Sequence, residues 1–131
     1  MDYKTFYNRV QKTYPFVTDH LAPDPFLREM TQLPDLLDRF VAITGYSRED
    51  IIKNRNDSRI LFVAVIIKLS DPLFFNFDER ARYRLILSLS RILRCDKGQI
   101  LYNLRKSKNF WKVYPDFRDK VGHLYDQIIL L

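Results

Sequence analysis

Cysteine occurs only once among the 131 residues, at position 95. A single cysteine forms no internal disulfide and no thiolate metal cluster, and it suits a reducing cytoplasm. Only 3 glycines and 6 prolines are present, which argues against long flexible linkers. The longest apolar run, residues 60–67, is far shorter than the roughly 20 residues that cross a bilayer. The charged start of the sequence lacks the apolar stretch of a signal peptide, so we expect a cytoplasmic protein with no membrane partner.

Side chains typical of catalysis are also scarce. His20 and His123 are the only histidines, and neither has a serine or cysteine at a fixed spacing that would make it a catalytic base. Asp19 and Asp119 each give one of them a second metal ligand, but no third ligand follows. The phosphate-binding pattern Gly-x-x-x-x-Gly-Lys-Ser/Thr is absent from the sequence. We therefore expect a protein that is not an enzyme and that holds no cofactor and no metal.

The composition otherwise fits one helical domain. Hydrophobic residues make up 47% of the chain and aromatic residues 15%, which is enough for one core at this length and too little for two. Apolar residues recur at spacings of three and four, which predicts amphipathic helices at residues 2–13, 36–43, 48–54, 78–93, 97–107 and 115–128. Prolines at 15, 23, 25 and 34 predict irregular chain between the first two of these, with at most a short helix at 26–31. In the helix at 78–93, the side chains expected to face inward are Tyr83, Ile86, Leu87, Leu89 and Leu93.

One segment, residues 60–67, is a continuous run of Ile, Leu, Phe, Ala and Val. Such a run forms either a buried strand or a helix that is buried on every side. Residues 58–69 contain no glycine or proline, and no second strand-like run is present to pair with a strand. This segment is therefore predicted to be the central helix of an all-α, compact fold.

Several predicted helices carry signals at their ends. Ser47 with Asp50, and Asp96 with Gln99, have the spacing of a capping box at the start of a helix. Gly45 is placed to end the preceding helix, because glycine readily adopts the left-handed conformation that follows a last helical turn.

The positive charge is concentrated in one segment. The chain has 22 Lys and Arg against 16 Asp and Glu, a net charge of +6. Positions 91–112 contain 7 basic residues and 1 acidic residue, a net of 7 − 1 = +6, so the remaining 15 basic and 15 acidic residues cancel. A polyanion such as nucleic acid is attracted to a segment of this kind. The alternative is an ordinary solvated helix face.

The helix predicted at residues 97–107 has two distinct faces. In projection, Ile100, Leu101 and Leu104 fall on one side and are expected to face the core. The opposite arc contains Gly98, Gln99, Tyr102, Asn103 and Lys106, with Arg105 at its edge. Amide and hydroxyl groups followed by cations are what contacts to base edges, flanked by contacts to phosphates, require. With the preceding helix and a turn at Arg94 and Cys95, the pattern predicts a helix-turn-helix.

Residues 40–131 resemble the C-terminal double-stranded-DNA-binding domain, domain IV, of the bacterial replication initiator DnaA, which has a Trp-repressor-like helical fold. The segment FVAITGYSREDII at 40–52 is similar to the opening of that domain, and NRNDSRILFVAVIIKL at 54–69 to its basic loop and long helix. Arg59 matches the leading arginine of that helix, which in the family faces the duplex. The segment DKGQILYNLRK at 96–106 is similar to the recognition helix, and residues 114–131 to the terminal helix.

The segment at 96–106 departs from the sequence motif that is typical of the family's recognition helix. Lys97, Gly98 and Gln99 stand where the family has a histidine and two small hydroxyl residues, so those base contacts are not carried over. Asp96 matches by type the aspartate that the family uses to read cytosine. Because the family's nucleotide-binding module is missing, the resemblance implies a stand-alone DNA-binding domain in replication or transcription control, of a bacterium, a phage in a bacterial host or a mobile element. Residues 1–39 are then an N-terminal helical extension of the domain at 40–131, and both belong to one structural unit.

We therefore expect non-enzymatic binding of double-stranded DNA by a recognition helix at about residues 97–107 and a basic loop. The residues expected to contact DNA are Arg55, Asn56, Arg59, Arg91, Arg94, Asp96, Lys97, Gly98, Gln99, Tyr102, Asn103, Arg105, Lys106 and Lys108.

Plainer roles stay open for several of these residues. Asp96 and Gln99 can serve only as a helix cap, and Arg55 and Arg59 can pair with Asp50 or Asp57. The aromatic residues near the end of the recognition helix, Phe110, Trp111 and Tyr114, either stack on bases or belong to the core.

The competing hypothesis is a structural or protein-interaction module built on a DNA-binding fold. Its contact with a protein partner would be made by the same face, by residues 1–39, or by the apolar end formed by Ile128, Ile129, Leu130 and Leu131. The sequence does not indicate an oligomeric state.

Overall fold

The structure, a computed structural model, describes residues 24–76 and 81–131. Its regular elements in these ranges are six α-helices: α3 (Leu33–Thr44), α4 (Arg48–Ile52), α5 (Ser58–Ser70), α6 (Tyr83–Ile92), α7 (Lys97–Val113) and α8 (Pro115–Leu130). Three short 3-10 turns join them: η1 (Met30–Gln32), η2 (Arg55–Asp57) and η3 (Phe74–Asn76). The predicted all-α class is confirmed. The helix predicted at residues 2–13 lies outside the described residues.

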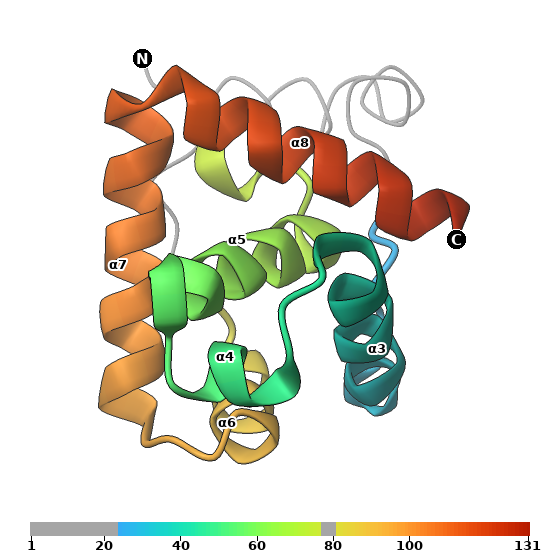
Figure 1. Cartoon of the computed structure of the whole chain (residues 1–131), viewed down its shortest axis with the longest axis vertical. Helices are drawn as coiled ribbons and strands as arrows, with labels where there is room; N and C mark the ends of the chain where they lie inside the picture. The colour runs from blue at the N-terminus through green and yellow to red at the C-terminus, as the bar shows by residue number, and fades with distance from the viewer. Residues whose placement is uncertain (1–23, 77–80) are drawn as a thin grey trace, which may run out of the picture.

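Helix α5 is the centre of the fold. In Figure 1 it runs through the middle of the molecule. Helix α7 lies along the left side of the view, α3 lies on the right side, and α8 runs across the top. Helices α7, α8, α4 and α3 all contact it. Every side chain at residues 60–67 is buried, because an apolar residue at each position leaves no polar face to turn toward water. The interpretation of this run as a central helix is confirmed.

One hydrophobic core extends from Leu27 to Ile128. The rings of Phe40 and Phe62 meet edge to face in this core, with their centroids 5.1 Å apart. Helix α3 continues across positions 39 and 40, and its side chains on both sides of this point are buried in the same core. The boundary after residue 39 stays a prediction, but the described residues on either side of it share one hydrophobic interior.

The start of α4 has the predicted capping box. The Ser47 hydroxyl accepts a hydrogen bond from the Asp50 amide, and the Asp50 carboxylate accepts one from the Ser47 amide, each at 3.0 Å. Gly45 ends α3 with φ of 78°, as its position predicts. Helix α4 ends at Ile52, two residues before the predicted end. The reason is Asn54, whose φ of 53° is left-handed and cannot continue a helix.

Asn54 also caps α5 from outside that helix. Its side-chain oxygen accepts hydrogen bonds from the amides of Arg59 and Ile60, at 3.1 and 3.3 Å. Asn54, Asn56 and Asp57 all have positive φ, and Asn and Asp are the residues other than glycine that best tolerate this conformation. The connection between α4 and α5 therefore turns sharply and still satisfies the first amides of α5.

Replacing Asn54 with alanine should lower the free energy of unfolding by about 1–2 kcal/mol, because α5 loses its cap. Urea denaturation followed by circular dichroism measures this loss. Asn56→Ala is the matched control, since Asn56 has nearly the same φ, 52°, and its side chain caps no helix within the described ranges. A loss no larger in Asn54→Ala than in the control would contradict the capping role.

Three further predicted helices differ from the structure. The helix predicted at residues 97–107 extends to Val113 as α7. Helix α6 begins at Tyr83 rather than at residue 78; the positions 78–80 lie outside the described residues. Tyr83 is 63% exposed rather than inward. It is the first residue of α6, and the side chains that this helix buries are Leu85, Ile86 and Leu89. The helix predicted at 26–31 is a 3-10 turn over Met30–Gln32 that leads directly into α3.

Candidate nucleic-acid interface

Helices α6 and α7 are joined by a four-residue turn whose backbone is held by hydrogen bonds. Arg94 is left-handed, with φ of 52°, and the Cys95 amide donates to the Ser90 carbonyl at 3.1 Å. Leu93 is fully buried and anchors the turn to the core. Burial raises the pKa of the Cys95 thiol, which disfavours the reactive thiolate. Cys95 therefore has a structural place in this turn.

Asp96 caps α7. Its carboxylate accepts a hydrogen bond from the Gln99 amide at 2.8 Å. A β-carbon added at Gly98 would lie 3.1 Å from the same carboxylate oxygen, so glycine at position 98 leaves room for the cap. The expected cap is confirmed for Asp96, and Gln99 keeps an exposed side chain at the beginning of the helix.

The exposed face of α7 differs from the predicted face at two positions. Leu101, expected in the core, is 53% exposed, and Asn103, expected on the DNA face, is 0% exposed. The residues that α7 buries are Ile100, Asn103, Leu104 and Ser107. These residues are three or four positions apart, as on a helix face that packs against a core. Two of them, Asn103 and Ser107, are polar, so the apolar pattern alone predicted that Leu101 is buried and Asn103 is exposed.

Asn103 therefore cannot contact DNA, and the prediction that it does is wrong. Its side-chain nitrogen and oxygen are both buried and have no hydrogen-bond partner within the described part of the chain. An amide that is buried without a hydrogen-bond partner destabilises the folded state, because its hydrogen bonds to solvent are not replaced.

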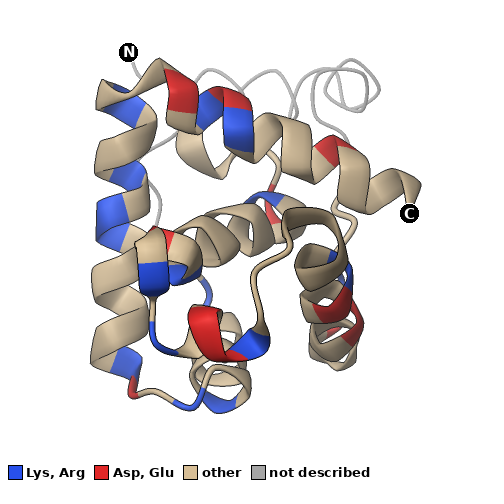
Figure 2. Cartoon of the chain, viewed as in Figure 1, with Lys and Arg blue, Asp and Glu red and all other residues tan. Residues whose placement is uncertain are grey.

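Acidic partners neutralise cations in the first half of the described chain. The ion pairs found there are Arg28 with Asp24, Arg39 with Asp35, Arg48 with Asp38, Lys53 with Glu49, and Arg55 with Asp50. Within residues 24–76 and 81–131, no Asp or Glu pairs with the cations Arg91, Arg94, Lys97, Arg105, Lys106 and Lys112. Figure 2 shows Lys and Arg positions at the start of α7 and along its second half, and acidic positions mainly on α3, α4 and α8. Every charged residue of α7 is therefore a cation, and such a helix attracts a polyanion.

The cations of α7 lie against aromatic rings. The charged groups of Arg105 and Lys106 lie 5.9 and 5.5 Å from the centre of the exposed Tyr102 ring, within the range of cation–π attraction. Lys108 is half-buried, with its ammonium 4.9 Å from the Phe74 ring. Tyr102 thus holds two cations on the outer face of α7.

The predicted basic loop contributes less than expected. The Arg55 guanidinium pairs with Asp50 at 3.2 Å. An ion pair of this kind is the alternative to a DNA contact that the sequence left open for Arg55. Arg59 is half-buried. One of its terminal nitrogens donates a hydrogen bond to the Ile52 carbonyl at 2.9 Å, and its Nε is buried with no hydrogen-bond partner among the described residues. Asn56 is exposed. Arg59 therefore ties the start of α5 to the end of α4, a role that sequence analysis missed because the acceptor is a backbone carbonyl.

The aromatic residues at the end of α7 divide between core and surface. Trp111 stacks on Phe75, with ring centroids 4.5 Å apart and planes 11° from parallel. Tyr114 is exposed, and its ring contacts Phe110 edge to face. For Trp111 the core alternative is confirmed.

Residues 24–76 and 81–131 contain no group of three or more His, Cys, Asp or Glu that could hold a metal. None of their helices combines the length and the apolar character needed to span a membrane. Comparisons with protein-family models, curated proteins and solved structures found no match to the chain. The resemblance to the DnaA C-terminal domain therefore stays a prediction.

Proposed function

We propose that this protein binds double-stranded DNA without enzymatic activity, with α7 as the recognition helix of a DnaA-like helix-turn-helix. The observation that carries the proposal is a row of cations on α6, the turn and α7 that have no acidic partner in the described part of the chain, in contrast to the paired cations of α3 and α4. These cations are Arg91, Arg94, Lys97, Arg105, Lys106 and Lys112. Cations on one exposed element are the electrostatic footprint of a nucleic-acid-binding surface.

The dimensions of α7 suit the major groove. An α-helix with its side chains is about 10–12 Å wide, and the major groove of B-DNA is about 12 Å wide. Among the exposed residues at the start of α7, Gly98, Gln99 and Tyr102 would face the base edges. The Gln99 amide suits adenine. Gly98 keeps the helix narrow at the point of closest approach.

Phosphate contacts would come from both ends of this surface. Arg91 and Arg94 lie before α7, while Arg105 and Lys106 lie two turns into it, so the cations flank the residues that would read bases. Such contacts fix the position of the helix on the duplex without reading its sequence. The biological setting that we propose is replication or transcription control in a bacterium, phage or mobile element.

Salt dependence tests this proposal. If about six phosphates are contacted, the logarithm of the duplex association constant should fall against the logarithm of salt concentration with a slope near −5. Fluorescence anisotropy with a labelled random-sequence duplex at several salt concentrations measures the slope. A slope near zero, or equal retention of single-stranded and duplex pools, would contradict recognition of duplex DNA by this surface.

A second candidate function, protein binding, is favoured by the exposed end of α8. Ile129 and Leu130 are 37% and 86% exposed, and Leu131 is exposed beside them. Exposed adjacent apolar residues are typical of contact surfaces. Under this alternative, Ile129→Asp with Leu130→Asp abolishes binding of a protein partner. Under the DNA proposal the same double variant keeps duplex affinity within about threefold, a change that reflects only its two added negative charges.

A further inference from the structure

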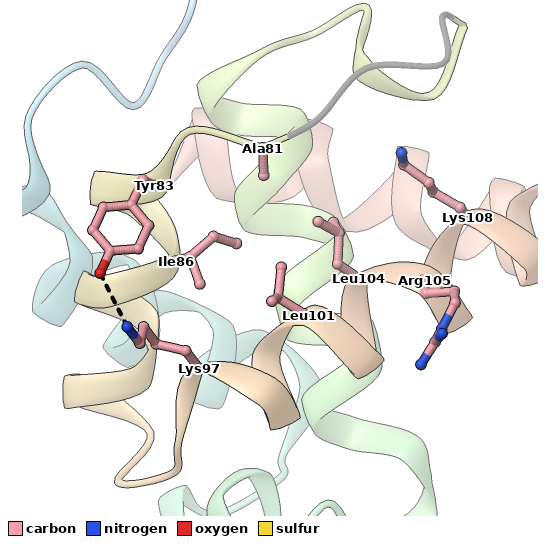
Figure 3. A pocket seen from close by; sticks show the side chains of 8 residues that line it. All are labelled: Ala81, Tyr83, Ile86, Lys97, Leu101, Leu104, Arg105 and Lys108. Carbon is pink, nitrogen blue, oxygen red and sulfur yellow. Dashed lines mark hydrogen bonds between the residues drawn. The ribbon is translucent and has the colours of Figure 1, made fainter.

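A groove of about 690 Å³ lies between α6 and α7. Its floor is apolar and is made by Ala81, Ile86, Leu101 and Leu104. Figure 3 shows the side chains of Ile86, Leu101 and Leu104 gathered between the two helices, with Ala81 above them. Leu101 is 53% exposed, although it lies on α7, a helix whose charged residues are all Lys or Arg. This leucine therefore offers apolar surface that nothing within the described residues covers.

Cations lie at both ends of this groove. At one end, the Lys97 ammonium donates a hydrogen bond to the Tyr83 hydroxyl at 3.0 Å and lies 5.2 Å from the centre of its ring. At the other end are Arg105 and Lys108. No Asp or Glu is among the described residues that line the groove. The groove is therefore complementary to an occupant that is apolar in its middle and negative at both ends.

From this arrangement we infer that the groove binds an acidic amphipathic helix of a partner protein. Lys97, Leu101, Arg105 and Lys108 follow each other at helical spacings of four, four and three, so they form one stripe along α7. At 1.5 Å per residue the stripe is about 16 Å long. Helix-in-groove binding uses such a stripe, with apolar anchors in the middle and charges that fix the register.

The spacing of the charges favours a peptide over other anions. A fatty acid carries a single carboxylate and engages one end of the groove, whereas an acidic helix presents carboxylates two turns apart along one face. Duplex DNA uses the cations but has little use for the apolar floor. Because Lys97 and Arg105 serve both ligands, the partner helix would exclude DNA from α7. That exclusion rests on the proposed function, but the groove itself does not.

The test uses a designed probe. A fluorescein-labelled helical peptide of about four turns carries glutamates two turns apart and leucines between them on the same face. A scrambled peptide of the same composition is the control. Fluorescence anisotropy against the full chain should show tighter binding of the designed peptide. Equal binding of the two peptides would overturn the inference, and so would tighter binding of laurate, which would assign the groove to a small amphiphile.

Leu101→Gln separates this inference from DNA binding. The variant should weaken peptide binding about tenfold, the effect expected when one leucine loses its apolar contact, and should leave duplex affinity within about twofold, because no charge is changed. Leu130→Gln, at an 86% exposed position on α8, is the matched control and should leave peptide binding unchanged. Peptide affinity that is unaffected by Leu101→Gln would overturn the inference. Peptide binding by a chain that binds no duplex would sustain it and refute the proposed function alone.

Discussion

Replacing Arg105 and Lys106 with glutamate should lower the affinity for duplex DNA by about 100-fold or more at moderate salt. Each substitution removes a phosphate contact and adds a charge that the DNA repels. Both cations lie over the exposed Tyr102 ring on the outer face of α7 and pair with no acid in the described ranges, so no structural ion pair is lost. Electrophoretic mobility shift or anisotropy with a random-sequence duplex measures the change.

The control for this double variant must carry the same change in charge. Arg118 and Lys120 are exposed on α8, and their replacement with glutamate alters the net charge equally. Under the proposal this control loses less than about tenfold, because only the general attraction between protein and DNA is reduced. Equal losses in the two double variants would show that net charge, and not α7, governs the interaction. Circular dichroism establishes that both variants remain helical.

Replacing Asn103 with leucine should raise the free energy of unfolding by about 1–3 kcal/mol, since it removes a buried amide without partners. Asparagine and leucine have the same branched shape, so the change fits the space that exists. The side chain is 0% exposed, and duplex affinity should therefore stay unchanged. Urea denaturation measures the stability, and the anisotropy assay measures the affinity.

Asn109→Leu is the control for this substitution. Asn109 lies on the exposed side of α7, where a polar-to-apolar change should alter the free energy of unfolding by no more than about 0.5 kcal/mol. A less stable Asn103→Leu protein would mean that the amide has a partner that holds it in the fold. A loss of duplex affinity would mean that α7 turns its Asn103 side outward when it binds DNA.

The parts of the fold that sequence could predict are those set by local chemistry. The central helix follows from an unbroken apolar run, and the caps at Ser47 and Asp96 follow from side chains that reach only three residues. The left-handed turn after α3 follows from Gly45. In each case the cause lies within a few residues of the effect.

The errors have a common cause, which is packing between distant elements. Helix α7 packs against both α5 and α6. The positions of these two neighbours, and not the apolar pattern of α7 alone, decide that Asn103 is buried and Leu101 is exposed. Arg59 binds a carbonyl seven residues away in another helix. The groove between α6 and α7 likewise depends on how the two helices diverge after the turn, which no periodicity within either helix specifies.

The most direct test of DNA recognition by α7 is to map the binding surface by nuclear magnetic resonance while a random-sequence duplex is added. The proposal predicts that amide signals from the turn at residues 93–96 and from residues 97–106 move first and furthest, while those of α3 stay in place. Shifts confined to the end of α8, around Ile129 and Leu130, with unchanged signals from α7, would contradict it.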